Sequence, residues 1–363
     1  MSTVTLPTAA PPAEARPKAT AAEVLDRLRG PLRVLAAFVA ALVLFGIVIA
    51  LKGVNPITAY KDMFVSTFTS WDSIAGIVVR STPIILAALA VTVPARAGLI
   101  NVGGEGQMIM GGIGAMGVSL LVDGGLPGGL TLVLMVLAAA TCGAAWSLLA
   151  GVLRRYMNIS ESVTTLLLNY VALDLMFFLI YDRWKDRNGT GQPTTRALPV
   201  AERLSLIGWG RVHSGLFIAI GAAVIVALVF RYTSWGFRLR VVGGNAEAAR
   251  RSGLKVGALL LSAMAVGGAL AGLGGLTQLA GAEFKLRSGF IATYGYIGFL
   301  ASWLGRHRPL YVVLSSFLLS AIAISGDSLQ LDSQLPAASV NILMSLVLLM
   351  VLGFGTKKKG ALS

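Results

Sequence analysis

Long apolar segments separated by short polar ones dominate the chain of 363 residues. A helix needs about twenty apolar residues to cross a bilayer, and ten segments reach or approach that length. None shows the period-two alternation of a transmembrane β-strand, so helices satisfy their backbone hydrogen bonds. We therefore predict an all-α polytopic membrane protein with about ten transmembrane helices, within a range of eight to ten. The segments are 32–51, 81–95, 107–122, 130–153, 162–181, 215–230, 258–280, 290–304, 310–325 and 337–354.

The polar segments divide the rest of the chain. Residues 1–30 are rich in Ala, Pro and Thr without an apolar period, which predicts a disordered cytosolic tail. The first apolar segment is too long for a signal-peptide core and is predicted to be a retained span. The predicted parts are a transmembrane domain at 31–355, with an outer loop at 182–214 and a cytosolic loop at 231–256, and a basic cytosolic tail at 356–363.

Composition and charge agree with this class and orient it. Hydrophobic residues make up 56% of the chain and charged residues 13%, and the mean hydropathy is +0.78, unlike soluble domains. If both termini are cytosolic, the inner segments hold nineteen of the 30 Lys and Arg residues, as the positive-inside rule expects. A basic inner rim facing anionic membrane lipid explains the net charge of +14, so no nucleic-acid partner is expected.

Residue types that carry common enzyme chemistry are sparse. The two histidines, His213 and His307, lie far apart in basic loops, and Cys142 is the single cysteine, so we expect neither a metal site nor a cofactor. The pattern G-x-x-x-x-G-K-[ST] does not occur, and the G-x-G-x-x-G match at 112–117 lies within an apolar span. Because no nucleophile and base stand at usable spacing, we predict that the chain is not an enzyme.

A polar strip at 96–110 between two apolar segments is the first candidate site. Polar groups at membrane depth are functional candidates, and the glycines here could form an interrupted or re-entrant turn. For Glu105 an equal alternative is that it satisfies the N–H groups that start the following span. Asp174 lies five residues after Asn169, about 140° around a helix, so both cannot face a narrow pore. The predicted pathway residues are Asn101, Glu105, Gln107 and Asn169.

Other residues in the spans are weaker candidates. Small residues at 268–275 predict close helix packing. Residues 98–114 and 289–305 are both interrupted by glycine and both precede two further spans, which hints at an internal repeat. Polar residues are more often interhelical partners, and aromatic residues either stack on a base or form an interfacial belt. These candidates are Gln278, Ser302, Asn341, Tyr294, Tyr296 and Trp303.

The loop at 231–256 contains the second candidate site. Asn245 can accept hydrogen bonds as an N-cap, residues 246–252 favour a helix, and Gly253 suits the left-handed position after it. The charge order, acid first and bases last, matches the helix dipole. So short a helix needs a surface to dock on; the alternative is a connector lying on lipid headgroups.

Sequence motifs give this loop a family context. Residues 247–253, E-A-A-R-R-S-G, reproduce the pattern E-A-A-x-x-x-G, and the loop resembles the coupling loop of permease subunits of bacterial ATP-binding-cassette (ABC) importers. The strip at 97–107 is similar to the signature of the simple-sugar and nucleoside branch, and stretches at 55–60, 162–170 and 295–305 agree in the family's order. The resemblance implies a type II importer-like helical bundle in the bacterial plasma membrane, with both termini cytosolic.

The resemblance also implies function and partners. The expected partners are a cytosolic ATPase, a second permease that forms a heterodimer with this chain, and an outer substrate-binding protein or lipoprotein. The expected cargo is a nucleoside, with a simple sugar such as ribose or another small solute as the alternative. A secondary transporter driven by an ion gradient is the alternative from another class. The residues expected to couple to the ATPase are Arg238, Asn245, Glu247, Ala248, Ala249, Arg250, Arg251 and Gly253.

Overall fold

The computed structural model describes residues 21–355 except 188, 190, 209, 333, 334 and 337. Within this part of the chain the structure is helical, and the β-structure consists of two isolated bridges. Residues 1–20 of the predicted tail and the basic tail at 356–363 lie outside the described residues. Helix α1 begins at Ala21, so residues 21–30 belong to the first helix and not to the tail.

Each of the ten predicted spans contains one helix. Seven helices are long and apolar enough to cross a membrane, and α1 and α13 contain shorter apolar stretches. The all-α polytopic class is therefore confirmed for the described residues. The elements are α1 (Ala21–Ala50), α2 (Pro56–Phe68), α3 (Trp71–Arg96), α4 (Gly104–Val122), α5 (Gly128–Met157), α6 (Glu161–Phe178), η1 (Leu179–Arg183), η2 (Val200–Glu202), α7 (Gly215–Tyr232), α8 (Ser234–Gly244), α9 (Ala246–Arg251), α10 (Val256–Gln278), η3 (Leu279–Glu283), α11 (Tyr294–Leu304), α12 (Pro309–Asp332) and α13 (Ala338–Gly355).

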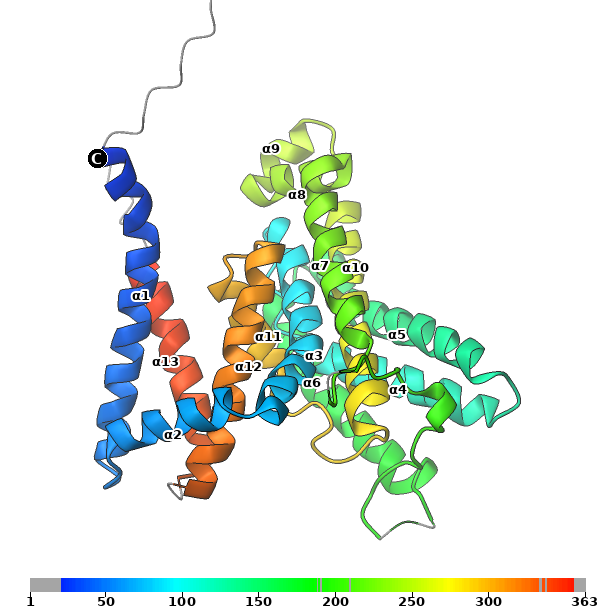
Figure 1. Ribbon diagram of the computed structural model, residues 1–363. Helices are drawn as coiled ribbons and strands as arrows, with labels where there is room; N and C mark the ends of the chain where they lie inside the picture. Colours follow the sequence, from blue (N-terminus) through cyan, green and yellow to red (C-terminus); the bar gives the residue numbers. More distant parts are fainter. Residues whose placement is uncertain are drawn as a thin grey trace, which may run out of the picture.

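Helices α3 and α10 form the centre of the bundle. Every residue of α3 from Ser81 to Pro94 is buried, because α10, α11, α12 and α7 pack around it. Helix α10 packs in turn against α5 and α4. Helices α1 and α13 pair beside this bundle (Figure 1).

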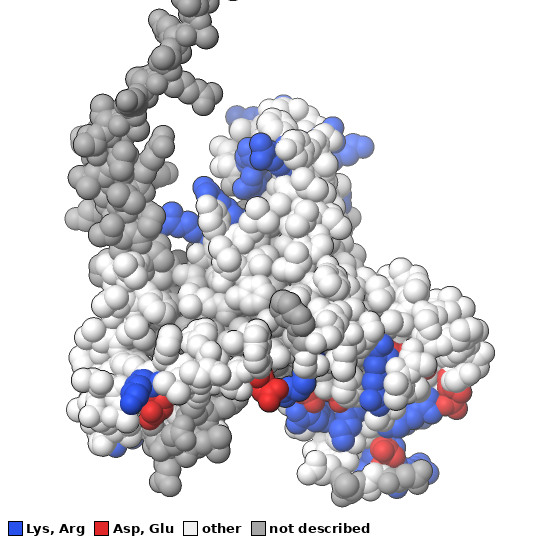
Figure 2. All heavy atoms as spheres, viewed as in Figure 1, with Lys and Arg blue, Asp and Glu red and all other residues white. Residues whose placement is uncertain are grey.

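The two ends of the molecule differ. Helices α8 and α9 lie at one end, which we call the α9 side, and the loop at 184–214 lies at the other, the opposite side (Figure 1). Helix α1 runs away from the α9 side and α13 runs back toward it. Figure 2 shows Lys and Arg at the α9 side of the visible face, whereas both signs of charge meet at the opposite side.

Helix α2 is an element that the hydrophobic pattern does not predict. The Asn55 side chain accepts a hydrogen bond from the Ile57 N–H at 3.0 Å, and Pro56 occupies the first helical turn. Both are signals of a helix start, so the sequence contained the information. Helix α2 lies across the foot of α1, packs against α12, and buries Ala59 and Met63 (Figure 1).

The small residues of α10 allow the closest contacts in the bundle. A Cβ atom on Gly275 would lie 1.9 Å from the Met108 carbonyl oxygen, and one on Gly272 would lie 2.0 Å from the Ala139 carbonyl oxygen. No larger residue fits at either position. The predicted close packing is confirmed, and α10 meets α4 and α5 backbone to backbone.

Candidate functional site

Two helices begin inside the molecule and meet at their N-termini. After α3, the irregular segment 97–103 leads into α4; after η3, the segment 284–293 leads into α11. A Cβ atom on Gly295 would lie 2.1 Å from the Glu105 backbone nitrogen, so the two helix starts are in backbone contact. We call this contact, with its two irregular segments, the central junction. Each break precedes its own helix and two further ones, in agreement with the suggested internal repeat.

Glu105 joins the two helix starts. Its carboxylate accepts hydrogen bonds from the N–H groups of Thr293 at 2.8 Å and Gly295 at 2.9 Å. A carboxylate at a helix N-terminus satisfies free N–H groups and complements the helix dipole. The alternative prediction, that Glu105 accepts hydrogen bonds from free N–H groups at a helix start, is therefore correct in the type of interaction. It is wrong in the helix, because Glu105 caps α11 and not α4, the helix that contains it.

Three buried amides hold the segment 97–103 in place. Asn101 and Gln107 exchange two hydrogen bonds, at 3.0 and 2.9 Å, and Asn101 also donates to the Ala90 carbonyl at 3.0 Å. Asn169 accepts from the Gly106 N–H at 2.8 Å and donates to the Val102 carbonyl at 3.1 Å. Because every amide is engaged within the protein, these residues support an irregular backbone at membrane depth. Their role in the pathway stays a prediction.

Four of the six weaker candidates form a hydrogen bond or a cation–π contact with another side chain of the protein. Ser302 forms hydrogen bonds with Thr92 at 2.8 Å and with His307 at 2.9 Å, as expected of an interhelical partner. The Arg80 guanidinium lies over the Tyr294 ring at 5.3 Å, so a protein cation already covers one face of this ring. The Gln278 side chain lies 3.5 Å from Glu283, and the Tyr296 hydroxyl lies 3.4 Å from the Asn169 amide. Trp303 is partly buried, and Asn341 is exposed.

One face of α6 combines exposed apolar and ionisable side chains. Leu167 and Tyr170 are each 58% exposed, and Asp174 is exposed one turn further along the same face. Asn169 points the other way and is buried, as the predicted angular separation requires. An ionisable group on a lipid-facing surface is costly, so such groups usually face water or another protein chain. The i, i+4 spacing of Tyr170 and Asp174 places both on one face of a helix, and this spacing is visible in the sequence.

Helix α9 has the predicted geometry. The Asn245 side chain accepts from the N–H groups of Glu247 and Ala248, both at 3.0 Å, and Gly253 adopts a φ of +82°. Glu247 pairs with Arg250 at 3.1 Å and with Arg251 at 3.2 Å. The predicted N-cap, short helix and left-handed terminator are confirmed.

Of the eight residues predicted to couple to the ATPase, one is buried and seven are exposed. Ala249 is buried against Val242 of α8 and Val256 of α10, so it fastens α9 to the bundle. The other seven candidates, including Arg238 on α8, are exposed. Helix α8 itself was not predicted, although Thr233 caps it by accepting from the Gly236 N–H at 3.1 Å.

Helix α8 rests directly on the end of α3. A Cβ atom on Gly243 would lie 2.4 Å from the Arg96 carbonyl oxygen, and a Cβ atom on Gly98 would lie 3.4 Å from the Gly243 Cα. The backbone beside α9 therefore touches the central helix where the irregular segment 97–103 begins.

The loop on the opposite side is tied to the second irregular segment. The Thr195 N–H donates to the Leu286 carbonyl at 3.0 Å and the Leu198 N–H to the Phe284 carbonyl at 2.7 Å. His213, at the end of the loop, accepts from the Gly215 N–H through Nδ1 at 3.2 Å and is 1% exposed. Burial lowers the pKa of His213 to about 4, so the ring is neutral at physiological pH.

Comparison with known proteins identifies the family. The family model described as branched-chain amino acid transport system / permease component matches residues 73–352, and the chain belongs to this family. The glucose ABC transporter permease protein TsgB13 of Haloferax volcanii is 35% identical, over 86% of this chain and 84% of the relative. The nucleoside permease NupB of Lactococcus lactis is 30% identical, over 90% and 92%, and the guanosine permease NupP of Bacillus subtilis 28%, over 90% and 94%.

Family and fold together define the class of the protein. The chain is a permease subunit of the ABC importer type, a multi-pass protein of the bacterial plasma membrane and a transport component, not an enzyme. A permease of this class works with a separate ATPase subunit and with a substrate-binding protein. The expected partners of these two kinds are therefore confirmed.

Proposed function

We propose that this permease imports nucleosides and that α9 is the helix through which the ATPase drives it. The geometric observation that carries the coupling proposal is the combination of an exposed α9 surface with the backbone contact between Gly243 and the end of α3. The nucleoside assignment is supported by two relatives whose names specify guanosine or nucleosides and which align along at least 90% of both chains.

The α9 side is the cytosolic side in this proposal. Arg238, Arg250 and Arg251 lie there, and Lys and Arg gather at this end of the molecule (Figure 2), as the positive-inside rule expects. Both termini are then cytosolic as well. The loop at 184–214 faces outward, where a substrate-binding protein delivers its cargo.

Coupling follows a short mechanical route. ATP-driven closure of the ATPase displaces α9, and the Ala249 anchor carries α8 with it. Gly243 then pushes on Arg96 and on the start of the segment 97–103, so α3 moves relative to α4. This is a two-state bundle whose equilibrium is biased by an external chain.

The pathway in this proposal lies along the exposed face of α6, opposite a second, non-identical permease. Leu167, Tyr170 and Asp174 form the wall on this chain. The aromatic ring can stack on a base, and the carboxylate can accept from a sugar hydroxyl. Asn169 lies on the buried face of α6 and joins this wall to the segment 97–103 and to α4, while Asn101, Glu105 and Gln107 hold that segment and the start of α11 in place.

A simple sugar is the second candidate cargo. The relative named as a glucose permease has the higher identity, 35%, and a nucleoside contains a sugar, so both present hydroxyl groups to the same wall. An ion gradient as the energy source is the candidate from another class, and family membership argues against it.

Uptake into cells that carry the permease with its partner subunits tests these proposals. Radiolabelled guanosine, glucose and ribose are compared for the wild type, a Glu247→Arg/Gly253→Trp variant and the control Arg155→Gln, at matched membrane abundance. We expect ATP-dependent guanosine uptake that uncouplers leave intact at constant ATP, that the double variant loses and that the control keeps. If only glucose is taken up, the cargo is a sugar and not a nucleoside. If the double variant takes up as much as the wild type, α9 has no coupling role.

A further inference from the structure

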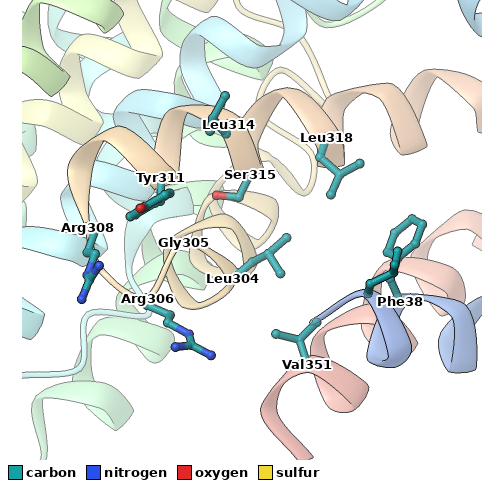
Figure 3. Close-up of a pocket in the computed structure, with 11 residues that line it drawn as sticks. Phe38, Leu304, Gly305, Arg306, Arg308, Tyr311, Leu314, Ser315, Leu318 and Val351 are labelled. Carbon is teal, nitrogen blue, oxygen red and sulfur yellow. The ribbon is translucent and has the colours of Figure 1, made fainter. Parts of the chain in front are cut away.

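A groove of about 640 Å³ separates α12 from the α1–α13 pair. Figure 3 shows α12 along one side and Phe38 of α1 and Val351 of α13 across from it. Its walls are mainly apolar, with Leu314 66% and Leu318 41% exposed on α12. Ser315 donates its hydroxyl to the Ala301 carbonyl at 2.6 Å, so it offers the groove no free donor.

One end of the groove is strongly basic. Arg306 and Arg308, from the turn between α11 and α12, line this end and are exposed (Figure 3). Arg308 also lies close enough to Arg96 for their charges to interact, as does Arg240 of α8. None of the ion pairs found among the described residues involves any of these four arginines. Like charges without acidic partners attract an anion.

From this arrangement we infer that the groove binds an anionic phospholipid. The acyl chain lies along Leu314 and Leu318, and the headgroup phosphate lies between Arg306 and Arg308. An apolar channel that ends in unpaired guanidinium groups matches a phospholipid in both polarity and charge. A protein partner in the same place would have to bring its own acidic groups to these arginines.

The site would also place a lipid beside the moving parts. Arg96 ends α3, and Arg240 lies on α8, which touches α3 through Gly243. A phosphate between Arg306 and Arg308 would offset the repulsion between Arg308 and Arg96, and would so link the α11–α12 turn to the end of α3. Anionic lipid then stabilises one arrangement of these elements over the other.

Native mass spectrometry of the full chain, purified with the subunits that accompany it, tests the inference and does not depend on which side faces the cytosol. The protein is equilibrated with palmitoyl-oleoyl phosphatidylglycerol or phosphatidylcholine. We expect preferential retention of phosphatidylglycerol by the wild type. In Arg306→Gln/Arg308→Gln the affinity should fall roughly fivefold for each arginine, about twenty-fivefold in all. The control Arg155→Gln/Arg231→Gln, with the same loss of charge outside the groove, should keep the preference.

Two further results separate a lipid from a protein occupant. Leu318→Trp narrows the apolar part and should reduce retention of both lipids while the arginines remain. A photoreactive benzoylphenylalanine at position 318 should cross-link to phosphatidylglycerol. Equal retention by the wild type and the double arginine variant would overturn the inference, and so would cross-linking at 318 to a protein chain in place of lipid.

Discussion

The central junction and helix α9 both carry polar residues, but they use them in opposite ways. At the junction, Asn101 and Glu105 direct their polar groups to atoms of the same chain and are buried or partly buried. At α9, Glu247, Arg250 and Arg251 pair only with one another and are exposed. Groups that are satisfied inside stabilise the fold, whereas we propose that the exposed, self-capped helix α9 is a surface for another chain. Changes at the junction should therefore cost stability, and changes at α9 should cost coupling.

The largest effect on stability is expected for Glu105→Leu. This substitution leaves the N–H groups of Thr293 and Gly295 without their acceptor. Because each unpaired buried group costs about 1–3 kcal/mol, the free energy of unfolding should fall by about 2–6 kcal/mol. Glu105→Gln is the matched control, because it keeps one acceptor oxygen and should lose about half as much. Thermal unfolding in detergent measures both. If Glu105→Leu and the wild type had equal unfolding midpoints, the central junction would not stabilise the fold through Glu105.

His213 extends the contrast to a buried group on the opposite side. Its pKa of about 4 in the folded state lies below the ordinary value of 6.5 because burial disfavours the charged ring. The unfolded chain therefore binds a proton that the folded chain does not as the pH falls from 6.5 to 4, and about 3 kcal/mol of stability is lost over that range. Above pH 6.5 no such loss occurs.

The control for this pH dependence is His213→Asn, whose side-chain oxygen can still accept from the Gly215 N–H at the place of Nδ1. Unfolding is measured for both proteins between pH 7.5 and 4.5. The wild type should lose more stability than the variant over that interval. Parallel curves would show that His213 does not titrate on unfolding.

A smaller cost is expected for Asn169→Ala. The Gly106 N–H and the Val102 carbonyl lose their partner in α6. These are two neutral hydrogen bonds of about 0.5–1.5 kcal/mol each, so the loss is about 1–3 kcal/mol, less than for the bonds to the Glu105 carboxylate. Leu167→Ala, an exposed neighbour on the same helix, should change stability by about 0.5 kcal/mol or less. Thermal midpoints compare the two. If Leu167→Ala lost as much stability as Asn169→Ala, the two residues would not lie on an exposed and a buried face of α6, respectively.

The smallest effect on stability is expected for Glu247→Arg. It removes two exposed ion pairs between adjacent turns of α9, each worth about 0.3–0.5 kcal/mol, so stability should fall by about 1 kcal/mol or less and the thermal midpoint should move little. Transport should nevertheless fall strongly, because the acidic group of the proposed docking surface is replaced by a basic one. Uptake divided by the amount of folded permease measures the effect on coupling. If uptake fell only in proportion to the loss of folded protein, α9 would not differ from the central junction in the way proposed.

Local features were the predictable part of this molecule. The ten apolar segments each contain a helix, and seven helices of the described part are long and apolar enough to cross a membrane. Helix α9 follows from Asn245, the charge order and Gly253, all within nine residues. Helices α2 and α8 were missed although Asn55 and Thr233 cap them, because neither is apolar enough to stand out. The first helix was also placed to start at residue 32, whereas it starts at Ala21.

Contacts between distant segments were beyond the sequence. Glu105 and Thr293 are 188 positions apart, and no local pattern indicates that α4 and α11 begin at the same place. The same holds for Gly243 and Arg96, whose contact connects α8 to the centre. The exposure of Tyr170 and Asp174 likewise depends on which face of α6 the other helices cover.

The most direct test of the central claim measures ATP hydrolysis and uptake by the reconstituted importer with the Glu247→Arg/Gly253→Trp permease, alongside its thermal midpoint. We predict a modest loss of stability, about 1–2 kcal/mol, because Gly253→Trp places a side chain at a left-handed φ of +82°. Uptake should fall at least about fivefold, because coupling free energies of this kind are about 1–3 kcal/mol. Normal uptake by this variant would contradict the account, since α9 would then be dispensable for energy transfer.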